Sequence, residues 1–597
     1  MIRKLLLSSI GFFLMSMVGW SSGEQLDYGL VALPREDGSI FLSWRMLDAN
    51  PSRYGTSYSL ITEYELERKE GENGEWSNLS LRNQGRVNNH VDQDVTSGTK
   101  YTYRLSRTTV SREAQREAFE QYWKQYHANQ PMPDFDQVAE PVPDPVEITV
   151  TASDTGRSYF SIPLDGDYDY QKIGIGDLDG DGELEYVIRQ PDFNTDPYQQ
   201  PGYWKPSTTT YKLEAYEMDG TLKWRYDMGW AIEAGVWYAP WIIYDVDQDG
   251  RAEVYCKAGE GDPRTEKGHV ESGPEYLVKI DGETGEVVAK TDWIGREGFD
   301  SYNYYSRNFL NVAYLDGKTP SIYMQRGTYR LIRARTLDRD FNIIWEWEAT
   351  GEYEKYRGQS SHGSITTDVD QDGKDEIVIG AAVLDDDGKG LWTLAMGHPD
   401  VCYVADIVPD NPGVEIFYGF ETRQETDGIC VVDARTGKKL WAHKDPTRHI
   451  HGQGMVGDLL ADHPGMEVFA GERDLPQRWL YSAGGKLIQF MEKGSLSPRP
   501  VWWDADPQKE VVEGRTIRDW GGETIQEVEG KVVLIVDCLG DHREEVITAL
   551  DGEIRIYTTT IPDDTPQPCL LLNRQYRSSI AAQTMGYYYP AQLGPWQ

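Results

Sequence analysis

The stretch Asp177-Leu-Asp179-Gly-Asp181-Gly-Glu-Leu-Glu185 decides how this chain is expected to fold. Aspartates at alternate positions, glycines that allow a sharp bend and a glutamate a few residues later supply the oxygen atoms that bind Ca²⁺. The same pattern returns at residues 245–253 and 368–376. The predicted metal ligands of the three loops are Asp177, Asp179, Asp181 and Glu185, then Asp245, Asp247, Asp249 and Glu253, and then Asp368, Asp370, Asp372 and Glu376.

A short apolar, β-type run follows each of these loops, as in Tyr186-Val-Ile188 and Ile377-Val-Ile379. An EF-hand loop would instead lie between two helices and would carry its closing glutamate further along the chain. The loops are therefore expected to connect β-strands, with Ca²⁺ as the cofactor of the chain.

Weaker copies of the acidic pattern bring the number to eight. They begin near residues 177, 245, 316, 368, 406, 458, 504 and 537. A period of about 40–50 residues with β-type segments is typical of the blades of a β-propeller. We therefore predict an all-β fold in which residues 154–597 form an eight-bladed β-propeller. Most of the eight loops are expected to have a structural role, because structural ion sites outnumber catalytic ones.

Residues 24–153 are predicted to form a separate β-sandwich. Alternating apolar and polar residues at 38–44, 63–67, 100–105 and 146–151 indicate strands. The segment 97–104 resembles the tyrosine-corner strand of a fibronectin type III sandwich. A helical insertion is expected from Ser111 to about His127, and this unit offers no convincing set of catalytic residues.

Composition limits the possible partners and compartments. The formal net charge of −39 argues against a nucleic-acid partner, because phosphate binding requires a basic face. Residues 1–23 read as a secretory signal peptide with a basic start and a short apolar segment. No other stretch is apolar enough to span a membrane. A secreted or periplasmic monomer is expected, and its five widely spaced cysteines do not form a disulfide framework.

Several further segments together carry a family resemblance. They include 176–182, 272–277, 367–377, 387–390, 502–504, 539–545 and 555–562, and the tail around Tyr576-Arg577 and Ile580-Ala581. In this order, across residues 168–597, they resemble the rhamnogalacturonan lyases of polysaccharide lyase family 11. The resemblance implies an eight-bladed Ca²⁺ propeller behind an N-terminal sandwich, and an enzyme that cleaves a rhamnose–uronate polymer by β-elimination.

The implied reaction needs the uronate carboxylate to be neutralised, a base to remove the α-proton and, in some cases, an acid for the leaving oxygen. A divalent metal serves the first need as a Lewis acid. The resemblance assigns this metal to His362, His398, Asp400 and Glu421, each next to one of the repeated motifs. Each residue alone could equally be an ordinary polar residue. Imidazole is also an unusual ligand for Ca²⁺.

Tyr587 matches the tail tyrosine of the family near the substrate, although it could also be an aromatic residue that closes the last blade. Lys531 lies close to the position of the family's lysine but is slightly displaced. Together with His451, a possible cationic substitute, these residues form the predicted catalytic set. Asp192, which begins a long loop, is expected to bind substrate.

The chain departs from the family at the expected cleft. Gln453, in Gly452-Gln453-Gly454-Met455, replaces the family's arginine, and Gln171 replaces an asparagine. Both are predicted to bind substrate. Next to Gln171, Lys172 occupies a position where the family carries an acidic residue. Three explanations stay open: a different substrate, chemistry carried by other residues, or lost activity.

Two alternatives therefore compete with a rhamnogalacturonan lyase. One is a non-catalytic Ca²⁺-dependent propeller that binds glycans or proteins, and the other is a lyase that acts on another rhamnose- and uronate-containing glycan. The expected partner in the enzymatic case is an acidic polysaccharide. The sequence leaves the polymer, the endo or exo mode, and the identity of base and acid undecided.

Overall fold

The structure is a computed structural model that describes residues 24–47, 63–82, 87–108, 116, 120, 124 and 144–594, except 199, 201 and 588. The predicted signal peptide lies outside these residues. Of the helix expected over 111–127, only residues 116, 120 and 124 are described, and these three are helical. No helix among the described residues is both long and apolar enough to cross a membrane. All five cysteines are buried thiols.

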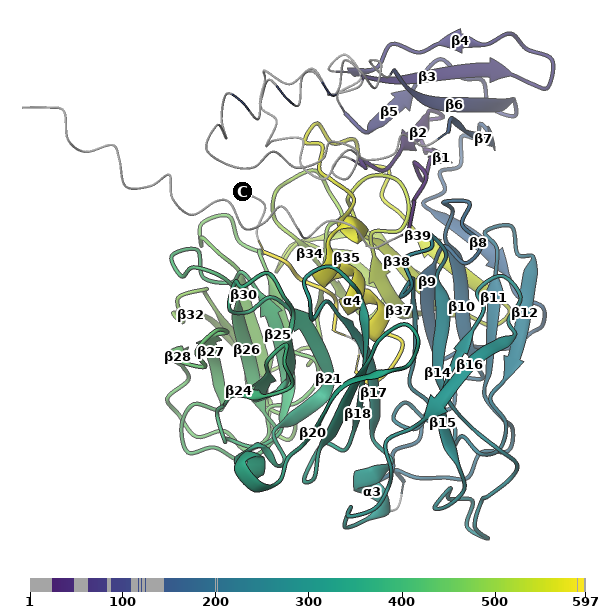
Figure 1. Cartoon of the computed structure of the whole chain (residues 1–597). Coiled ribbons are helices and arrows are strands. Elements are labelled where there is room, and N and C mark those ends of the chain that lie inside the picture. Colours follow the sequence, from purple (N-terminus) through teal and green to yellow (C-terminus); the bar gives the residue numbers. More distant parts are fainter. Residues whose placement is uncertain are drawn as a thin grey trace, which may run out of the picture.

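The N-terminal unit contains two small antiparallel sheets (Figure 1). The first orders its strands as β1 (Val31–Pro34), β2 (Ile40–Ser43) and β5 (Asn89–Asp92). The second orders them as β4 (Ser77–Asn78), β3 (Glu63–Glu70), β6 (Lys100–Thr108) and β7 (Val146–Thr151). Trp44 is fully buried between them, and the hydroxyl of Tyr101 accepts a hydrogen bond from the backbone N–H of Thr96 at 3.0 Å.

Residues 159–557 form eight four-stranded antiparallel sheets. Four sheets, each made of strands consecutive in the chain, are β9 (Lys172–Gly176), β10 (Glu185–Gln190), β11 (Lys212–Tyr216) and β12 (Leu222–Asp227); β13 (Trp241–Tyr244), β14 (Glu253–Gly259), β15 (Glu275–Ile280) and β16 (Val287–Asp292); β17 (Asn308–Ala313), β18 (Ser321–Arg326), β19 (Arg333–Leu337) and β20 (Ile343–Glu348); and β21 (Ser360–Thr367), β22 (Glu376–Gly380), β23 (Ala382–Leu384) and β24 (Gly390–Thr393).

Three more sheets follow the same order. They are β25 (Pro399–Ala405), β26 (Glu415–Phe420), β27 (Ile429–Asp433) and β28 (Lys439–Ala442); β29 (Met455–Gly457), β30 (Glu467–Gly471), β31 (Arg478–Tyr481) and β32 (Leu487–Met491); and β33 (Arg499–Val501), β34 (Glu510–Glu513), β35 (Thr516–Arg518) and β36 (Thr524–Glu527). The described helical segments in this part of the chain are α3 (Tyr302–Tyr305), η3 (Gly351–Tyr356), η4 (Leu570–Leu572) and α4 (Arg574–Ala582).

The eighth sheet is built from both ends of this region. Strands β37 (Lys531–Val536), β38 (Glu545–Leu550) and β39 (Glu553–Tyr557) are completed by β8 (Tyr159–Pro163). Ile162 lies opposite Ile554 in the β39–β8 pair, and both side chains are fully buried. The strand that leads into the first unit is thereby part of the last sheet, which makes the first and last units neighbours and pairs an edge of β39 that would otherwise be free.

Burial falls from the first to the fourth strand of a sheet. Every residue of β13, β17 and β25 is buried, whereas β16, β20 and β32 carry the exposed apolar residues. A strand buried on both faces is expected to be a continuous apolar run rather than an alternating one. The first strands therefore form the interior of the array, and the fourth strands form its rim.

Six of the eight acidic copies directly follow the first strand of a sheet, as Asp177 follows β9 and Asp537 follows β37, and the copies at Asp316 and Asp504 begin three residues after β17 and β33 end. In five of them a glutamate that begins the second strand accepts a hydrogen bond from the N–H just after the first aspartate. These pairs are Leu178–Glu185, Val369–Glu376, Ile407–Glu415, Leu459–Glu467 and Cys538–Glu545. The repeat is therefore one local turn used again at equivalent places.

Helix α4 packs against the first strands β9, β13, β17 and β21 and lies among the sheets in Figure 1. The side chain of Asn573 caps its N-terminus by accepting a hydrogen bond from Tyr576 N–H at 3.1 Å. On the same helix, buried Arg577 makes two 2.7 Å hydrogen bonds to the buried carboxylate of Glu24. This bidentate pair fastens the start of the described chain to the centre of the array.

The N-terminal unit contacts the end of the array that carries the acidic loops. Asp27 N–H donates to Gly182 O at 2.9 Å, and Gly540 N–H donates to Gly29 O at 2.9 Å. Gly182 and Gly540 belong to the first and last acidic loops. The other end of the first strands is not involved in these contacts.

Replacing Arg577 by methionine is expected to destabilise the protein strongly, because Glu24 would stay buried without its partner. Breaking a buried pair in this way costs about 3–5 kcal/mol, whereas removing both charges is often close to neutral. In urea unfolding followed by tryptophan fluorescence, Arg577→Met should therefore be less stable than the Glu24→Gln/Arg577→Met double variant. Equal stability of the single variant and the unchanged protein would contradict this prediction.

Candidate functional site

A cavity of about 440 Å³ opens where several first strands begin. Lys172 begins β9, Arg499 begins β33 and Lys531 begins β37. The lining residues are Gln171, Lys172, Asp192, Asn194, Thr195, Asp196, Gly202, Tyr203, Val236, Trp237, Gln453, Arg499, Lys531, Val532, Val533, Gly586 and Tyr587. The cavity is thus assembled from residues far apart in the sequence.

Five of the six residues predicted to bind or transform substrate line this cavity: Gln171, Asp192, Gln453, Lys531 and Tyr587. Two of these residues form an ion pair, because Lys531 Nζ lies 2.5 Å from Asp192 Oδ2 although the residues are 339 positions apart in the sequence. The sixth, His451, contacts Asp400 through Nδ1, and its ring centroid lies 6.3 Å from that of Tyr587.

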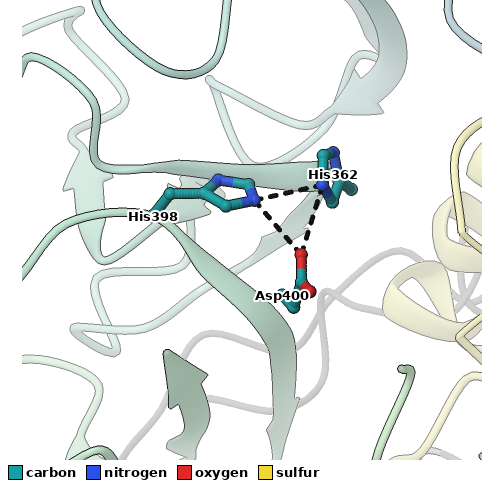
Figure 2. Close-up of side chains that lie close together, drawn as sticks. All are labelled: His362, His398 and Asp400. Carbon is teal, nitrogen blue, oxygen red and sulfur yellow. Dashed lines mark hydrogen bonds and ion pairs between the residues drawn. The ribbon is translucent and has the colours of Figure 1, made fainter. Parts of the chain in front are cut away.

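Next to the cavity, the residues predicted to bind the catalytic metal come together (Figure 2). Nε2 of His362 and Nε2 of His398 lie 3.2 and 3.3 Å from the same oxygen, Asp400 Oδ1, and 3.1 Å from each other. Glu421 Oε2 lies 3.5 Å from His398 Nε2. His362 comes from β21, Asp400 from β25, and Glu421 directly follows β26.

Hydrogen bonding sets the tautomer of one of these histidines. Nδ1 of His398 contacts the backbone carbonyl of Ser360, and a carbonyl can only accept. Nδ1 therefore carries a proton, and Nε2 is the nitrogen that faces His362 and Asp400. A protein carbonyl that fixes a ring in this way is typical of metal-binding histidines.

Asp400 is the centre of a larger histidine cluster. Its second oxygen, Oδ2, lies 3.3 Å from His449 Nε2 and also contacts His451 Nδ1. Burial alone would raise the pKa of Asp400, but hydrogen bonds with the four histidines hold that pKa well below its usual value. Burial, and then His398, lowers the pKa of His362 to about 3, so this ring is neutral near pH 7. An ionised Asp400 beside a neutral His362 is the protonation state that metal binding requires of these two groups.

The residues of this cluster fit a divalent cation. Ligand atoms of His362, His398 and Asp400 all lie within 4.8 Å of one another, and His362 Nδ1 is buried without a hydrogen-bond partner among the described residues. Two imidazole nitrogens that face each other at hydrogen-bond distance need a shared proton or a shared cation. The nitrogen-rich set is softer than the oxygen sets that Ca²⁺ prefers.

Tyr587 connects the cluster to the cavity. Its ring centroid lies 4.7 Å from that of His362 and 5.6 Å from that of Trp237. Gly586 precedes it with φ of +61°, and a Cβ at this position would lie 2.2 Å from His362 O. Only glycine fits this close, left-handed turn, which places the phenol between the His362–His398–Asp400 cluster and the open cavity.

The three strongest acidic loops also bring carboxylates together. The sets are Asp177, Asp179 and Glu185; Asp245, Asp247 and Glu253; and Asp368, Asp370 and Glu376. Asp179 Oδ1, Glu185 Oε1, Asp247 Oδ1 and Glu376 Oε1 are buried without a hydrogen-bond partner among the described residues. Buried carboxylate oxygens of this kind require a cation or a proton, so these loops fit Ca²⁺.

The remaining predicted loop ligands stabilise the turns themselves. Oδ1 of Asp181, Asp249 and Asp372 accepts a hydrogen bond from the backbone N–H two residues later, at 2.8 to 3.0 Å. Burial raises the pKa of Asp177 to about 7 and that of Glu185 to about 9. Without a cation these groups would hold protons near neutral pH, so cation binding is coupled to proton release.

The acidic loops and the cavity lie at opposite ends of the first strands. Lys172 begins β9 and Asp177 follows its last residue, and Lys531 and Asp537 bracket β37 in the same way. At about 3.3 Å per residue, such strands separate the two ends by roughly 15–20 Å. The acidic loops therefore lie too far from the cavity to contact its contents.

Several residues of the site were not predicted from the sequence. Asp196 accepts hydrogen bonds from Arg307 Nη2 and Trp237 Nε1, both at 2.8 Å, and the guanidinium of Arg307 lies 5.0 Å from the Trp237 ring centroid. His449 joins the Asp400 cluster, and Arg499 lines the cavity. The long loop after β10 hinted at Asp196, but the others lie in segments with no recognisable pattern.

Comparison with known proteins agrees with this architecture. The family model described as rhamnogalacturonan lyase family 11, C-terminal domain, matches residues 163–596. Rhamnogalacturonan endolyase YesW of Bacillus subtilis (strain 168) is 32% identical over 615 residues, covering 95% of this chain and 90% of the relative. Rhamnogalacturonan exolyase YesX of the same organism is 30% identical over 622 residues, covering 95% and 94%.

Solved structures give the same result across both parts of the chain. The crystal structure of rhamnogalacturonan lyase YesW superposes with a TM-score of 0.79 at 30% identity and covers 96% of each chain. A Bacillus licheniformis rhamnogalacturonan lyase PL11 superposes with a TM-score of 0.78 at 28% identity and the same coverage. The resemblance deduced from the sequence motifs is confirmed, and this chain belongs to rhamnogalacturonan lyase family 11.

Proposed function

We propose that this protein is a polysaccharide lyase that cleaves rhamnogalacturonan by β-elimination at a uronate residue. Relatives that match nearly the whole chain are named rhamnogalacturonan endolyase and exolyase. The observation that carries the proposal is the adjacency of a cation-lined cavity and the His362–His398–Asp400 cluster, joined by Tyr587. Family membership favours this enzyme over a non-catalytic binding propeller.

The metal cluster would serve the first requirement of the reaction. A divalent cation held by His362, His398, Asp400 and Glu421 supplies Lewis-acid neutralisation of the uronate carboxylate when bound. The side chains themselves are held before substrate arrives: Ser360 O orients His398, and the hydroxyl of Tyr589 donates to Asp400 O. Such preorganisation avoids rearrangement during the reaction.

Tyr587 fits the role of the proton donor to the leaving glycosidic oxygen. Burial, and then the Asp400 carboxylate, raises the pKa of its hydroxyl well above the usual value. The phenol is therefore protonated at neutral pH and can give its proton only when negative charge develops next to it. His451, whose Nδ1 contacts Asp400, would remove the α-proton of the uronate. Lys531, ion-paired with Asp192, could do so only in its neutral form.

Gln453 lies in the same cavity as Lys531 and Arg499. The cavity therefore offers cationic groups to an acidic polymer even though glutamine occupies the position of the family's arginine. These cations suit a uronate polymer, and the relatives named rhamnogalacturonan lyases favour rhamnogalacturonan as that polymer, with Gln171, Asp192 and Gln453 contacting the sugar.

We infer the finer architecture from the same observations. The eight sheets arranged in sequence and closed by β8 support an eight-bladed β-propeller over residues 154–597. The two N-terminal sheets and the Tyr101–Thr96 hydrogen bond support a fibronectin type III-like sandwich over 24–153. The apolar segment within residues 1–23 supports secretion or a periplasmic location, and a monomer that binds Ca²⁺ is the form we propose.

Wild-type protein should release unsaturated products from rhamnogalacturonan, followed by their ultraviolet absorbance. His398→Ala should lower kcat by about 10²–10³-fold, the cost of losing one preorganised electrostatic contact, with little change in Tm. Asp370→Ala, at a structural loop, should mainly lower Tm. Equal activity of His398→Ala and wild type would contradict the proposed role of the cluster.

Tyr587→Phe removes only the hydroxyl and should lower kcat by about 10²–10⁴-fold, as expected for a general acid or base. KM should change little, because the ring that packs on His362 and Trp237 remains. Tyr198→Phe, an exposed tyrosine that does not line the cavity, is the matched control. A Tyr587→Phe enzyme with wild-type kcat would rule out proton transfer by this residue.

Excess EGTA should lower Tm, because an ion that binds only the folded state stabilises it by mass action. A site saturated at about 100 times its Kd contributes about 2.7 kcal/mol. Elemental analysis should find Ca²⁺, and re-added Ca²⁺ should restore Tm. An unchanged Tm in EGTA, together with a protein free of Ca²⁺, would show that the acidic loops are not Ca²⁺ sites.

A further inference from the structure

Lys172 is a buried lysine in the wall of the cavity. Its side chain belongs to the first residue of β9, only 8% of the residue is exposed, and it lines the cavity. The ammonium donates a 3.3 Å hydrogen bond to the backbone carbonyl of Gln583, in the turn after α4. No carboxylate of the described residues lies within ion-pair distance of this ammonium.

The charges around Lys172 are mostly of the same sign. Arg189 on β10, Arg499 on β33 and Lys531 on β37 all disfavour its protonated form, and only Asp192, after β10, favours it. The Asp192 carboxylate is already engaged by Lys531. Gln583, on the remaining side, is uncharged. A buried ammonium among like charges is unstable unless an anion binds next to it and neutralises its charge.

The energetics of Lys172 match those of a binding residue. Burial, followed by Arg189, Arg499 and Lys531, lowers its pKa to about 7. A strongly shifted group in a cavity is a sign of a functional site when geometry agrees. An arriving carboxylate would remove the imbalance and return the amine to its charged form. A purely structural role, in which Lys172 only connects β9 to Gln583 by a hydrogen bond, would not require its side chain to line the cavity.

We propose that Lys172 contacts the substrate and binds the carboxylate of a uronate as an ammonium ion, in a cavity whose Gln453 carries no charge. This proposal rests on the proposed function, since it names a specificity-determining residue of the same cavity. The selected ligand is a rhamnogalacturonan chain with free uronate carboxylates. A chain whose carboxylates have been reduced to alcohols would lose this contact.

Lys172→Met should lower kcat/KM for rhamnogalacturonan about 10- to 100-fold, the range expected for one charge-assisted hydrogen bond. The Ki of a carboxyl-reduced rhamnogalacturonan oligosaccharide, an unreactive competitor, should change less than about two-fold, because its alcohol gains nothing from the charge. Lys212→Met, in the same sheet with its ammonium bound to Thr209 and Thr210, should leave both values unchanged.

The dependence of kcat/KM on pH distinguishes substrate binding by Lys172 from a purely structural role, which would not change that dependence. Since the amine loses its proton as pH rises through about 7, the contribution of Lys172 to kcat/KM should decline above that pH. Lys172→Arg, charged at all these values, should keep kcat/KM above that of Lys172→Met and lose the decline. Tm of each variant should be recorded, and Lys172→Gln replaces the methionine variant if that one does not fold.

The proposal is overturned if Lys172→Met keeps kcat/KM within about two-fold of wild type with an unchanged pH profile. Equal losses for the acidic and the carboxyl-reduced ligand would also overturn it, because they indicate a structural effect. If the wild-type protein shows no lyase activity, the proposed function fails separately. Calorimetric binding of the native and carboxyl-reduced oligosaccharides to wild type and Lys172→Met then still decides whether Lys172 recognises the carboxylate.

Discussion

The pairing of β8 with β39 is the constraint on which the rest of the structure depends. It places residues 159–163 in one sheet with residues 553–557, so the first and last units of the array become neighbours. Only then can Asp192, after β10, meet Lys531, at the start of β37, across 339 residues. The cavity draws on both sides of this closure, because Lys172 and Gln171 come from the first unit and Lys531 from the last.

Stability and chemistry occupy opposite ends of the same strands. At one end the acidic loops carry buried carboxylate oxygens that need a cation or a proton, and the N-terminal unit contacts two of these loops. At the other end the strands begin with Lys172, Arg499 and Lys531, which line the cavity. Helix α4 joins the ends, since Arg577 binds Glu24 while the turn after the helix delivers Gly586 and Tyr587 to the site. The repeated turns at one end of the strands can therefore support a cavity at the other end whose lining residues are not repeated from sheet to sheet.

Much of the candidate site could be predicted from the sequence because each residue lies beside a recognisable motif. His362 lies a few residues before Asp368, the first aspartate of a repeated turn, and Asp400 lies a few residues before Asp406. The structure brings His362, His398 and Asp400 within 3.3 Å of one another, although their catalytic role stays a proposal. His449 was missed because it belongs to no motif, although it lies two residues before His451, which was predicted. Arg499 likewise lies in no recognisable motif.

The repeated turn and the β-type segments between the turns could be predicted from local sequence, because both depend on neighbours within about ten residues, and the ordered set of motifs over residues 168–597 identified the family. Which repeats meet across the closure, how deeply Lys172 is buried and that Tyr587 lies against His362 follow only from the folded chain. Burial and like charge change the chemistry of a lysine or a tyrosine, and both arise from chain segments hundreds of residues apart. Local patterns contain no information about such distances, so the scaffold was predictable while the electrostatics of the cavity were not.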